Sequence, residues 1–189
     1  KGASEGSADV VKTIVVAQQD GKPEPAVAQA LAAKPDAVYV MTIPGLAGGV
    51  LKELRAKAFG GFIAAWSVAA TDGVVSAVGS AGAGMIFGTV VPSPASDQPG
   101  IRAKFRAFAK EQGIKPSYRA MEIYVTGRIL AEALTRGDAA PVTGAKVWAA
   151  LEGLRDANID GWRVHYSATD REGSTFVDTM MLLENGKFR

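Results

Sequence analysis

The sequence has no cysteine and only one histidine, His165. Disulfides and thiolate chemistry are therefore excluded. The lack of cysteine does not identify the cellular compartment, because periplasmic proteins often lack cysteine too. One histidine cannot make a multi-histidine metal site, and its place in an alternating strand pattern argues against a histidine-based triad. The acidic residues are scattered near turns without the spacing of a calcium loop, so no metal site is expected.

Long apolar runs and an excess of charge are also missing. No apolar run reaches the roughly 18 residues that a membrane-spanning helix needs, so the chain is not expected to cross a membrane. The formal net charge of +2 is too small to indicate a polyanionic partner, although the sequence pI of about 8.9 leans basic. The basic residues between positions 102 and 110 alternate with apolar ones, as on the solvated face of an amphipathic helix, and no nucleic-acid partner is expected.

The stretch from Asp36 to Ser67 organises the chain. Residues 37–41 form a short apolar run between proline-containing turns, which is typical of a strand buried on both faces of a parallel sheet. Residues 46–58 then place apolar side chains at helical spacing, with charged residues between them. A second apolar run, residues 62–66, follows directly, so the pattern predicts a β-α-β unit.

The same alternation extends to both sides of this unit. Residues 10–16 are expected to form a strand, 24–34 a short helix, 72–83 a weak helix and 85–91 another buried strand. The order β-α-β-α-β-α-β is that of a parallel sheet in an α/β fold. Gly79–Gly84 is rich in glycine, but it leads into a strand instead of following one; it does not fit a dinucleotide-binding fingerprint, and no cofactor is expected.

The second half of the chain has a different pattern. Residues 92–99 contain three prolines and are interpreted as a linker or crossover. Three helices are predicted beyond it, over residues 100–111, 117–135 and 143–154, the last with Thr143 as its N-cap. Strands are predicted at residues 163–166 and 176–184, and Asn185-Gly186 is a strong turn signal. The wide apolar stripes of the three helices need a cover, which implies a second sheet whose strands are not recognisable in these residues.

Six segments together carry a family resemblance, namely KPDAVYV, LRAKAFGGFIAAW, MIFGTVVP, FRAFAKEQGIKPSY, AMEIYVTGRILAEAL and SATDREGSTFVDTMMLLENGKF. Their order and spacing resemble the carboxyl-terminal part of a type I periplasmic solute-binding protein. The most similar group is the family of leucine/isoleucine/valine-binding proteins of ABC importers. The resemblance covers nearly the whole chain.

The resemblance implies a two-lobed binder in which each lobe is an α/β sandwich. Residues 1–91 would form the sheet domain of the second lobe, 92–99 the crossover, 100–158 helices of the first lobe, and 159–189 carboxyl-terminal strands near the hinge. The first lobe's own sheet, which the family places at the start of the chain, is absent from these residues. The resemblance therefore predicts that they are a fragment of a longer protein.

The resemblance implies that the protein is not an enzyme. The resemblance implies that the protein captures a small organic solute, an amino acid or an aromatic or other carboxylate, between the lobes and delivers it to the permease subunits of an ABC transporter. It also implies a periplasmic protein, or a membrane-associated extracytoplasmic one in a Gram-positive organism. Two alternatives stay open: a ligand-sensing regulatory protein of the same fold and, ranked last because a nucleophile elbow is missing, an α/β enzyme.

The family binds its solute with loops that follow the strands of the second lobe, and these loops match six positions here: Thr42, Ile43, Pro44, Gly45, Trp66 and Ser67. Thr42 and Ser67 offer hydroxyl groups, and the helix that begins near Gly45 offers free N–H groups to a carboxylate. Trp66 is either an aromatic wall for the ligand or a core residue that ends a strand. Neither loop has the acidic or tyrosine residue with which the family often holds an ammonium group, which favours an uncharged or aromatic carboxylate over an α-amino acid.

Overall fold

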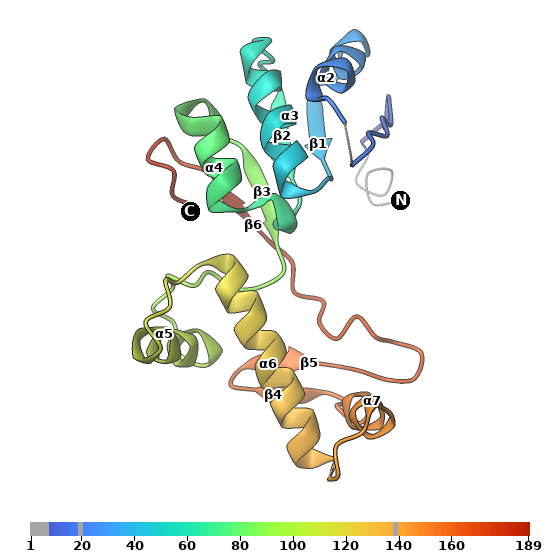
Figure 1. Cartoon of the computed structure of the whole chain (residues 1–189), viewed down its shortest axis with the longest axis vertical. Helices are drawn as coiled ribbons and strands as arrows, with labels where there is room; N and C mark the ends of the chain where they lie inside the picture. The colour runs from blue at the N-terminus through green and yellow to red at the C-terminus, as the bar shows by residue number, and fades with distance from the viewer. Residues whose placement is uncertain (1–7, 19–20, 138–139) are drawn as a thin grey trace. The chain divides into compact units, whose positions relative to one another are not determined.

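The computed structural model describes residues 8–18, 21–137 and 140–189. The chain forms two compact units (Figure 1): residues up to Thr89 together with Thr179–Arg189 make up the first, and Val90–Asp178 make up the second. Each unit has a hydrophobic core of its own.

The first unit alternates helices and strands. In chain order its elements are α2 (Pro23–Ala32), β1 (Ala37–Val40), α3 (Pro44–Ala56), β2 (Phe62–Ala65), the 3-10 turn η1 (Ser67–Ala69), α4 (Asp72–Val78), the 3-10 turn η2 (Gly79–Gly82), β3 (Ile86–Thr89) and β6 (Asp178–Met181). Proline in the first turn of α2 and α3 suits the start of a helix, because its missing N–H would have no intrahelical partner there. At the start of α4, the Thr71 hydroxyl accepts a hydrogen bond from Val74 N.

Four strands form one sheet in the order β1-β2-β3-β6. β1 and β2 are parallel, with Tyr39 opposite Ala64. β2 and β3 are also parallel, with Ala65 opposite Phe87. The predicted α/β fold with a parallel sheet is therefore confirmed, including the β-α-β unit formed by β1, α3 and β2.

The fourth strand comes from the end of the chain. Leu182, just beyond β6, donates to Met85 O and accepts from Gly84 N, both at 2.9 Å. Because Gly84 and Met85 lie just before β3, the carboxyl end of β6 lies beside the amino end of β3, and β6 runs antiparallel to it. The strand predicted at residues 176–184 is thus present but shorter.

The strand predicted at residues 10–16 is wrong. Residues 8–17 have no regular secondary structure, and Val15 is 93% exposed. A run of β-branched residues has a preference for extended backbone, but a strand is stable only when a neighbour pairs with it. No strand among the described residues pairs with this segment.

The two faces of the sheet differ. Val40, Ile63 and Phe87, which share one face by register, are buried, and α3 and α4 lie over the sheet (Figure 1). On the other face Tyr39 is 57% exposed and Phe62 is 74% exposed. The expectation that β1 is buried on both faces is therefore wrong for the described residues, because side chains of a strand alternate and only one set has helices above it.

The carboxyl terminus closes on itself as a hairpin. Met181 and Arg189 exchange two backbone hydrogen bonds, of 2.8 and 3.0 Å, across a turn in which Gly186 has a φ of 73°. This confirms the turn predicted at Asn185-Gly186, since such a φ is a conformation that glycine adopts without steric cost. The hairpin places the Phe188 ring edge-on against Phe87, with 5.3 Å between ring centroids.

The second unit contains three helices and a small hairpin. Its elements are α5 (Ile101–Glu111), α6 (Tyr118–Arg136), α7 (Gly144–Glu152), β4 (Ala157–Ile159) and β5 (Trp162–Val164). All three predicted helices are confirmed, and so is the N-cap of α7, where the Thr143 hydroxyl accepts from Lys146 N. No helix among the described residues has the length and apolar character needed to cross a bilayer.

The hairpin of β4 and β5 corrects the sequence analysis. β4 was not predicted; it begins after the last predicted helix, at residues that were grouped with the helices of segment 100–158. Asp160 and Gly161 join the strands with φ angles of 54° and 87°. Positive φ at both positions gives the two-residue Asp-Gly turn whose twist matches that of the two strands. Ile159 and Trp162 pack in the same core as Phe105 of α5, so part of the cover that the helices need lies within this chain.

Two phenylalanines of the first unit give a matched test of the sheet's buried and open faces. Replacing Phe87, which is fully buried, by alanine removes a large core side chain and should lower the free energy of unfolding by about 3–5 kcal/mol. Replacing the exposed Phe62 should change it by about 0.5 kcal/mol or less. Urea unfolding of the intact protein measures both, and equal losses would mean that the Phe62 face is covered in solution.

Candidate functional site

The loops after β1 and β2 lie at the same edge of the sheet. Because the two strands are parallel and in register from Ala37 with Phe62 to Val40 with Ala65, their carboxyl ends are side by side. Ligands of open α/β sheets bind at this edge. All six predicted site residues lie in the two segments that follow it, which we call the edge loops: residues 42–45 and 66–67.

A hydrogen bond joins the two edge loops directly. The Trp66 indole Nε1 donates to the Thr42 backbone oxygen at 2.8 Å, although the residues are 24 positions apart. The Trp66 backbone N–H donates to Val40 O at 3.3 Å, continuing the sheet by one residue. The indole N–H is thus occupied within the protein, and what Trp66 can present to a ligand is its partly exposed ring.

The amino end of α3 is the most polar part of the site. Ile43 is the N-cap and has no side chain able to cap the helix, unlike Thr71 before α4. Ala47 N bonds to Ile43 O at 2.9 Å, whereas the N–H groups of Gly45 and Leu46 have no carbonyl of the helix to bind. These two N–H groups and the positive end of the helix dipole favour an anion such as a carboxylate.

Gly45 leaves room above this helix end. It is exposed, and a Cβ atom built on it would meet no other atom within 4 Å. Thr42 and Ser67 are partly buried, and Ile43 is exposed. The site therefore contains two hydroxyl groups, the N–H groups of a helix end and an aromatic ring, with open space above Gly45.

No charged side chain belongs to the six residues, so the electrostatics of the site come from backbone dipoles. Among the described residues, Tyr166 and Arg128 of the second unit have a shifted pKa. Burial raises the pKa of the Tyr166 phenol. A hydrogen bond with Tyr124, more than the charge of Asp160, raises the pKa of the Arg128 guanidinium, although desolvation opposes this. Within the part of the chain that the structure describes, no three acidic, histidine or cysteine residues come together as metal ligands.

The sequence analysis missed Gly88 near the end of β3. A Cβ atom at Gly88 would lie 3.9 Å from Ser67 N and 4.0 Å from Ala65 O, so this small residue lies directly beside the second edge loop. The signal was present, because the rule that ligands bind at the carboxyl ends of parallel strands also applies to the third strand. A larger side chain at position 88 would reduce the space beside Ser67.

Comparison with known proteins agrees with this geometry. The model of a family described as periplasmic binding proteins matches residues 1–186. The chain belongs to the periplasmic binding protein family. None of the curated proteins compared with this periplasmic binding protein chain matches it.

Solved structures show the same fold. A substrate-binding periplasmic protein from Ralstonia solanacearum is 27% identical, with a TM-score of 0.72, and the match covers 87% of this chain and 48% of that one. A leucine-binding protein from Thermotoga maritima is 19% identical, with a TM-score of 0.79, covering 98% and 52%. An ABC transporter solute-binding protein from R. palustris, in complex with benzoate, is 24% identical, with a TM-score of 0.75, covering 98% and 50%. This periplasmic binding protein chain thus has the type I fold and spans about half the length of these structures.

The bond between the edge loops can be tested by Trp66→Phe. This change keeps an aromatic ring but removes the N–H that bonds to Thr42 O, so the free energy of unfolding should fall by about 0.5–1.5 kcal/mol. The control is Trp148→Phe, because Trp148 is 46% exposed in the second unit. Denaturant titration of the intact protein compares them, and an equal effect of the two changes would contradict a stabilising role for the bond.

Proposed function

We propose that this chain is part of an extracytoplasmic solute receptor that captures a small organic carboxylate at the edge loops and delivers it to the permease of an ABC transporter. The observation that carries the proposal is the convergence of two parallel strand ends on an uncapped helix terminus, with Trp66 bonded to Thr42 between them. Membership of the periplasmic binding protein family supports the same role.

The carboxylate would be held by backbone donors. Four hydrogen-bond donors lie at one edge of the sheet, namely the N–H groups of Gly45 and Leu46 and the hydroxyl groups of Thr42 and Ser67. The Trp66 ring would pack against the apolar part of the solute. Because these loops contain no acidic side chain to bind an ammonium group, an aromatic or other carboxylate without an ammonium group suits them better than an amino acid.

Two solved relatives by fold are named for solutes on either side of this expectation. One is a leucine-binding protein, and the other is in complex with benzoate. Both solutes carry a carboxylate, and they differ in whether an ammonium group stands beside it. An amino acid as the solute of this chain would require an acidic partner from outside the edge loops.

The assignment of lobes is part of the proposal. The first compact unit, residues up to 89 with 179–189, would be the second lobe of the receptor, and the second unit, residues 90–178, would belong to the first lobe and the crossover. The protein would work in the periplasm, or outside the cytoplasmic membrane of a Gram-positive organism.

We propose binding without chemistry, because none of the six site residues has a side chain suited to general acid or base catalysis near neutral pH.

The first experiment identifies the solute. The intact protein is purified without refolding, and native mass spectrometry followed by extraction reports what it carries. A small carboxylate is the expected result. A cofactor, or a substrate that the protein converts during incubation, would contradict the proposed function.

Substitutions test the site itself. Thr42→Ala and Trp66→Ala in the intact protein should each weaken binding of the identified solute by about tenfold or more, the loss expected for one hydrogen bond to a charged group or one aromatic contact. The melting temperature without solute should stay within a few degrees for Thr42→Ala, whereas Trp66→Ala also removes the bond to Thr42 O and should lower it by more. Isothermal calorimetry gives the affinity.

The matched controls are Thr126→Ala and Trp148→Ala, which remove exposed side chains of the same types from the second unit. Both should leave the affinity unchanged. If the controls and the edge-loop variants behaved alike, the solute would bind elsewhere and the assignment of Thr42 and Trp66 would be wrong.

A further inference from the structure

Gly88 is a glycine inside β3 that neither the backbone nor the packing of its unit requires. Its φ angle lies outside the left-handed region that favours glycine. A Cβ atom at this position would lie 3.9 Å from Ser67 N and 4.0 Å from Ala65 O, which are ordinary van der Waals distances. Gly82 differs, because a Cβ atom there would lie only 2.5 Å from a Val78 side-chain atom.

A glycine in a strand has a cost. It loses more conformational freedom on folding than any other residue, and it has no side chain to pack against its neighbours. Where the backbone conformation and the packing do not explain such a glycine, the remaining reason is that a ligand or another backbone approaches it closely. For Gly88, the neighbouring residues indicate which of the two it is.

Gly88 lies beside Trp66 on the open face of the sheet. Ala65 pairs with Phe87, so the next residues of the two strands, Trp66 and Gly88, are neighbours on the opposite face. Trp66 has extended backbone, so the alternation of side chains continues to it. Phe62, on the same face of β2, is exposed. Gly88 therefore borders the edge loops on the face where side chains are open to solvent.

The indole of Trp66 does not cover Gly88. Its Nε1 donates to Thr42 O, so the ring extends toward the end of β1, whereas Gly88 is on the other side of β2. The atoms within 4 Å of a Cβ built on Gly88 are backbone atoms of Ala65 and Ser67, not atoms of the ring. The edge of the sheet thus has Thr42 after β1, the indole at the end of β2 and bare backbone on β3.

The order of these strands gives the site a length. Neighbouring strands are about 4.8 Å apart, so Gly88 lies about 10 Å across the sheet from the end of β1, after which α3 begins. A solute with its carboxylate at the amino end of α3 would cross the Trp66 ring before it reached Gly88. A short carboxylate such as benzoate would end at the ring, whereas a longer one would place its apolar end on the Gly88 backbone.

We propose that Gly88 determines the length of solute that the edge loops accept. Its missing side chain leaves room for the apolar end of an elongated carboxylate, such as an arylalkanoate, that is longer than benzoate. This inference rests on the proposed function, because the carboxylate is bound at α3 and the solute packs against Trp66. It adds a third strand to the site and a chemical class to the solute.

Calorimetry on the intact, solute-free protein tests the length dependence with benzoate and 3-phenylpropanoate, which is longer by two methylene groups. The unsubstituted protein should bind 3-phenylpropanoate about tenfold more tightly, the gain expected from burying two methylene groups. Gly88→Val adds a side chain that suits a strand and blocks the far end of the site. It should weaken binding of 3-phenylpropanoate by about tenfold or more and that of benzoate by less than about threefold.

The stability of the solute-free protein separates a role in binding from a role in packing. Gly88→Ala should leave the melting temperature unchanged or raise it, because its Cβ has room and alanine restricts the unfolded chain. It should still weaken binding of 3-phenylpropanoate, by about threefold or more. The matched control is Gly127→Ala in α6, where a Cβ would meet no atom within 4 Å. This control should leave both affinities unchanged.

Three outcomes decide the matter. Equal losses for the two carboxylates in the Gly88 variants, or no loss, would overturn this inference and leave carboxylate capture at the edge loops standing. A clear fall in the melting temperature of Gly88→Ala would also overturn it, because packing would then require the glycine. If the unsubstituted protein bound neither carboxylate, the proposed function would fail together with this inference.

Discussion

The parallel pairing of β1 with β2 is the constraint on which the candidate site depends. Pairing Ala37 with Phe62 sets the register, and the register brings the two strand ends to one edge of the sheet. The bond from the Trp66 indole to Thr42 O then fixes one loop against the other. If β2 slipped by one residue, Trp66 would turn to the opposite face and the bond would be lost. The chemistry of the site is therefore a consequence of strand register.

The recognition proposed for the edge loops would use the backbone more than charged side chains. A proline at the first turn of α3, preceded by Ile43, starts a helix whose terminal N–H groups are not capped by a side chain. The side chains of Thr71, Ser117 and Thr143 cap α4, α6 and α7, whereas α2 and α5 lack a side-chain cap as α3 does. Fixed backbone dipoles of this kind bind an anion without the cost of burying a cation. The site can therefore be polar although none of its six residues is charged.

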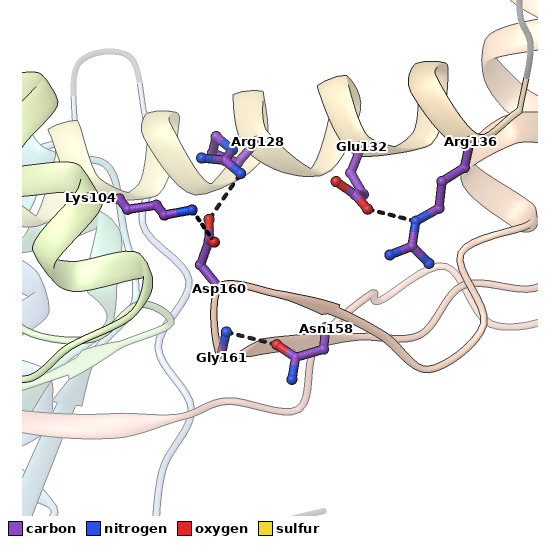
Figure 2. Close-up of polar contacts among 7 residues, drawn as sticks. All are labelled: Lys104, Arg128, Glu132, Arg136, Asn158, Asp160 and Gly161. Atoms are coloured by element: carbon purple, nitrogen blue, oxygen red, sulfur yellow. Dashed lines mark hydrogen bonds and ion pairs between the residues drawn. The ribbon is translucent and has the colours of Figure 1, made fainter.

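In the second unit, a charged residue in a turn connects the hairpin to two helices. Asp160 stands at the tip of the β4–β5 hairpin, in a turn that requires positive φ, and its carboxylate receives cations from α5 and α6 (Figure 2). Its backbone oxygen also accepts Ile101 N at 2.7 Å, which starts α5. Gly100 is needed beside it, because a Cβ atom there would lie 2.4 Å from Asp160 O. One residue thus holds the hairpin against both helices.

The sequence by itself determined the local elements. Apolar runs and helical spacing predicted β1, α3 and β2, and with them the edge of the sheet at which Thr42 and Trp66 lie. These elements were predictable because their signals act between residues that are near in sequence. The tertiary structure decided what depends on distant partners. Residues 10–16 have the composition of a strand but no described neighbour to pair with, and β6 occupies a place in the sheet that only its bonds to residues before β3 reveal. The bond from Trp66 to Thr42 O and the burial of Trp162 Nε1 without a partner among the described residues were likewise beyond the sequence. Each depends on a contact between segments far apart in the chain, and periodicity carries no information about which segments meet.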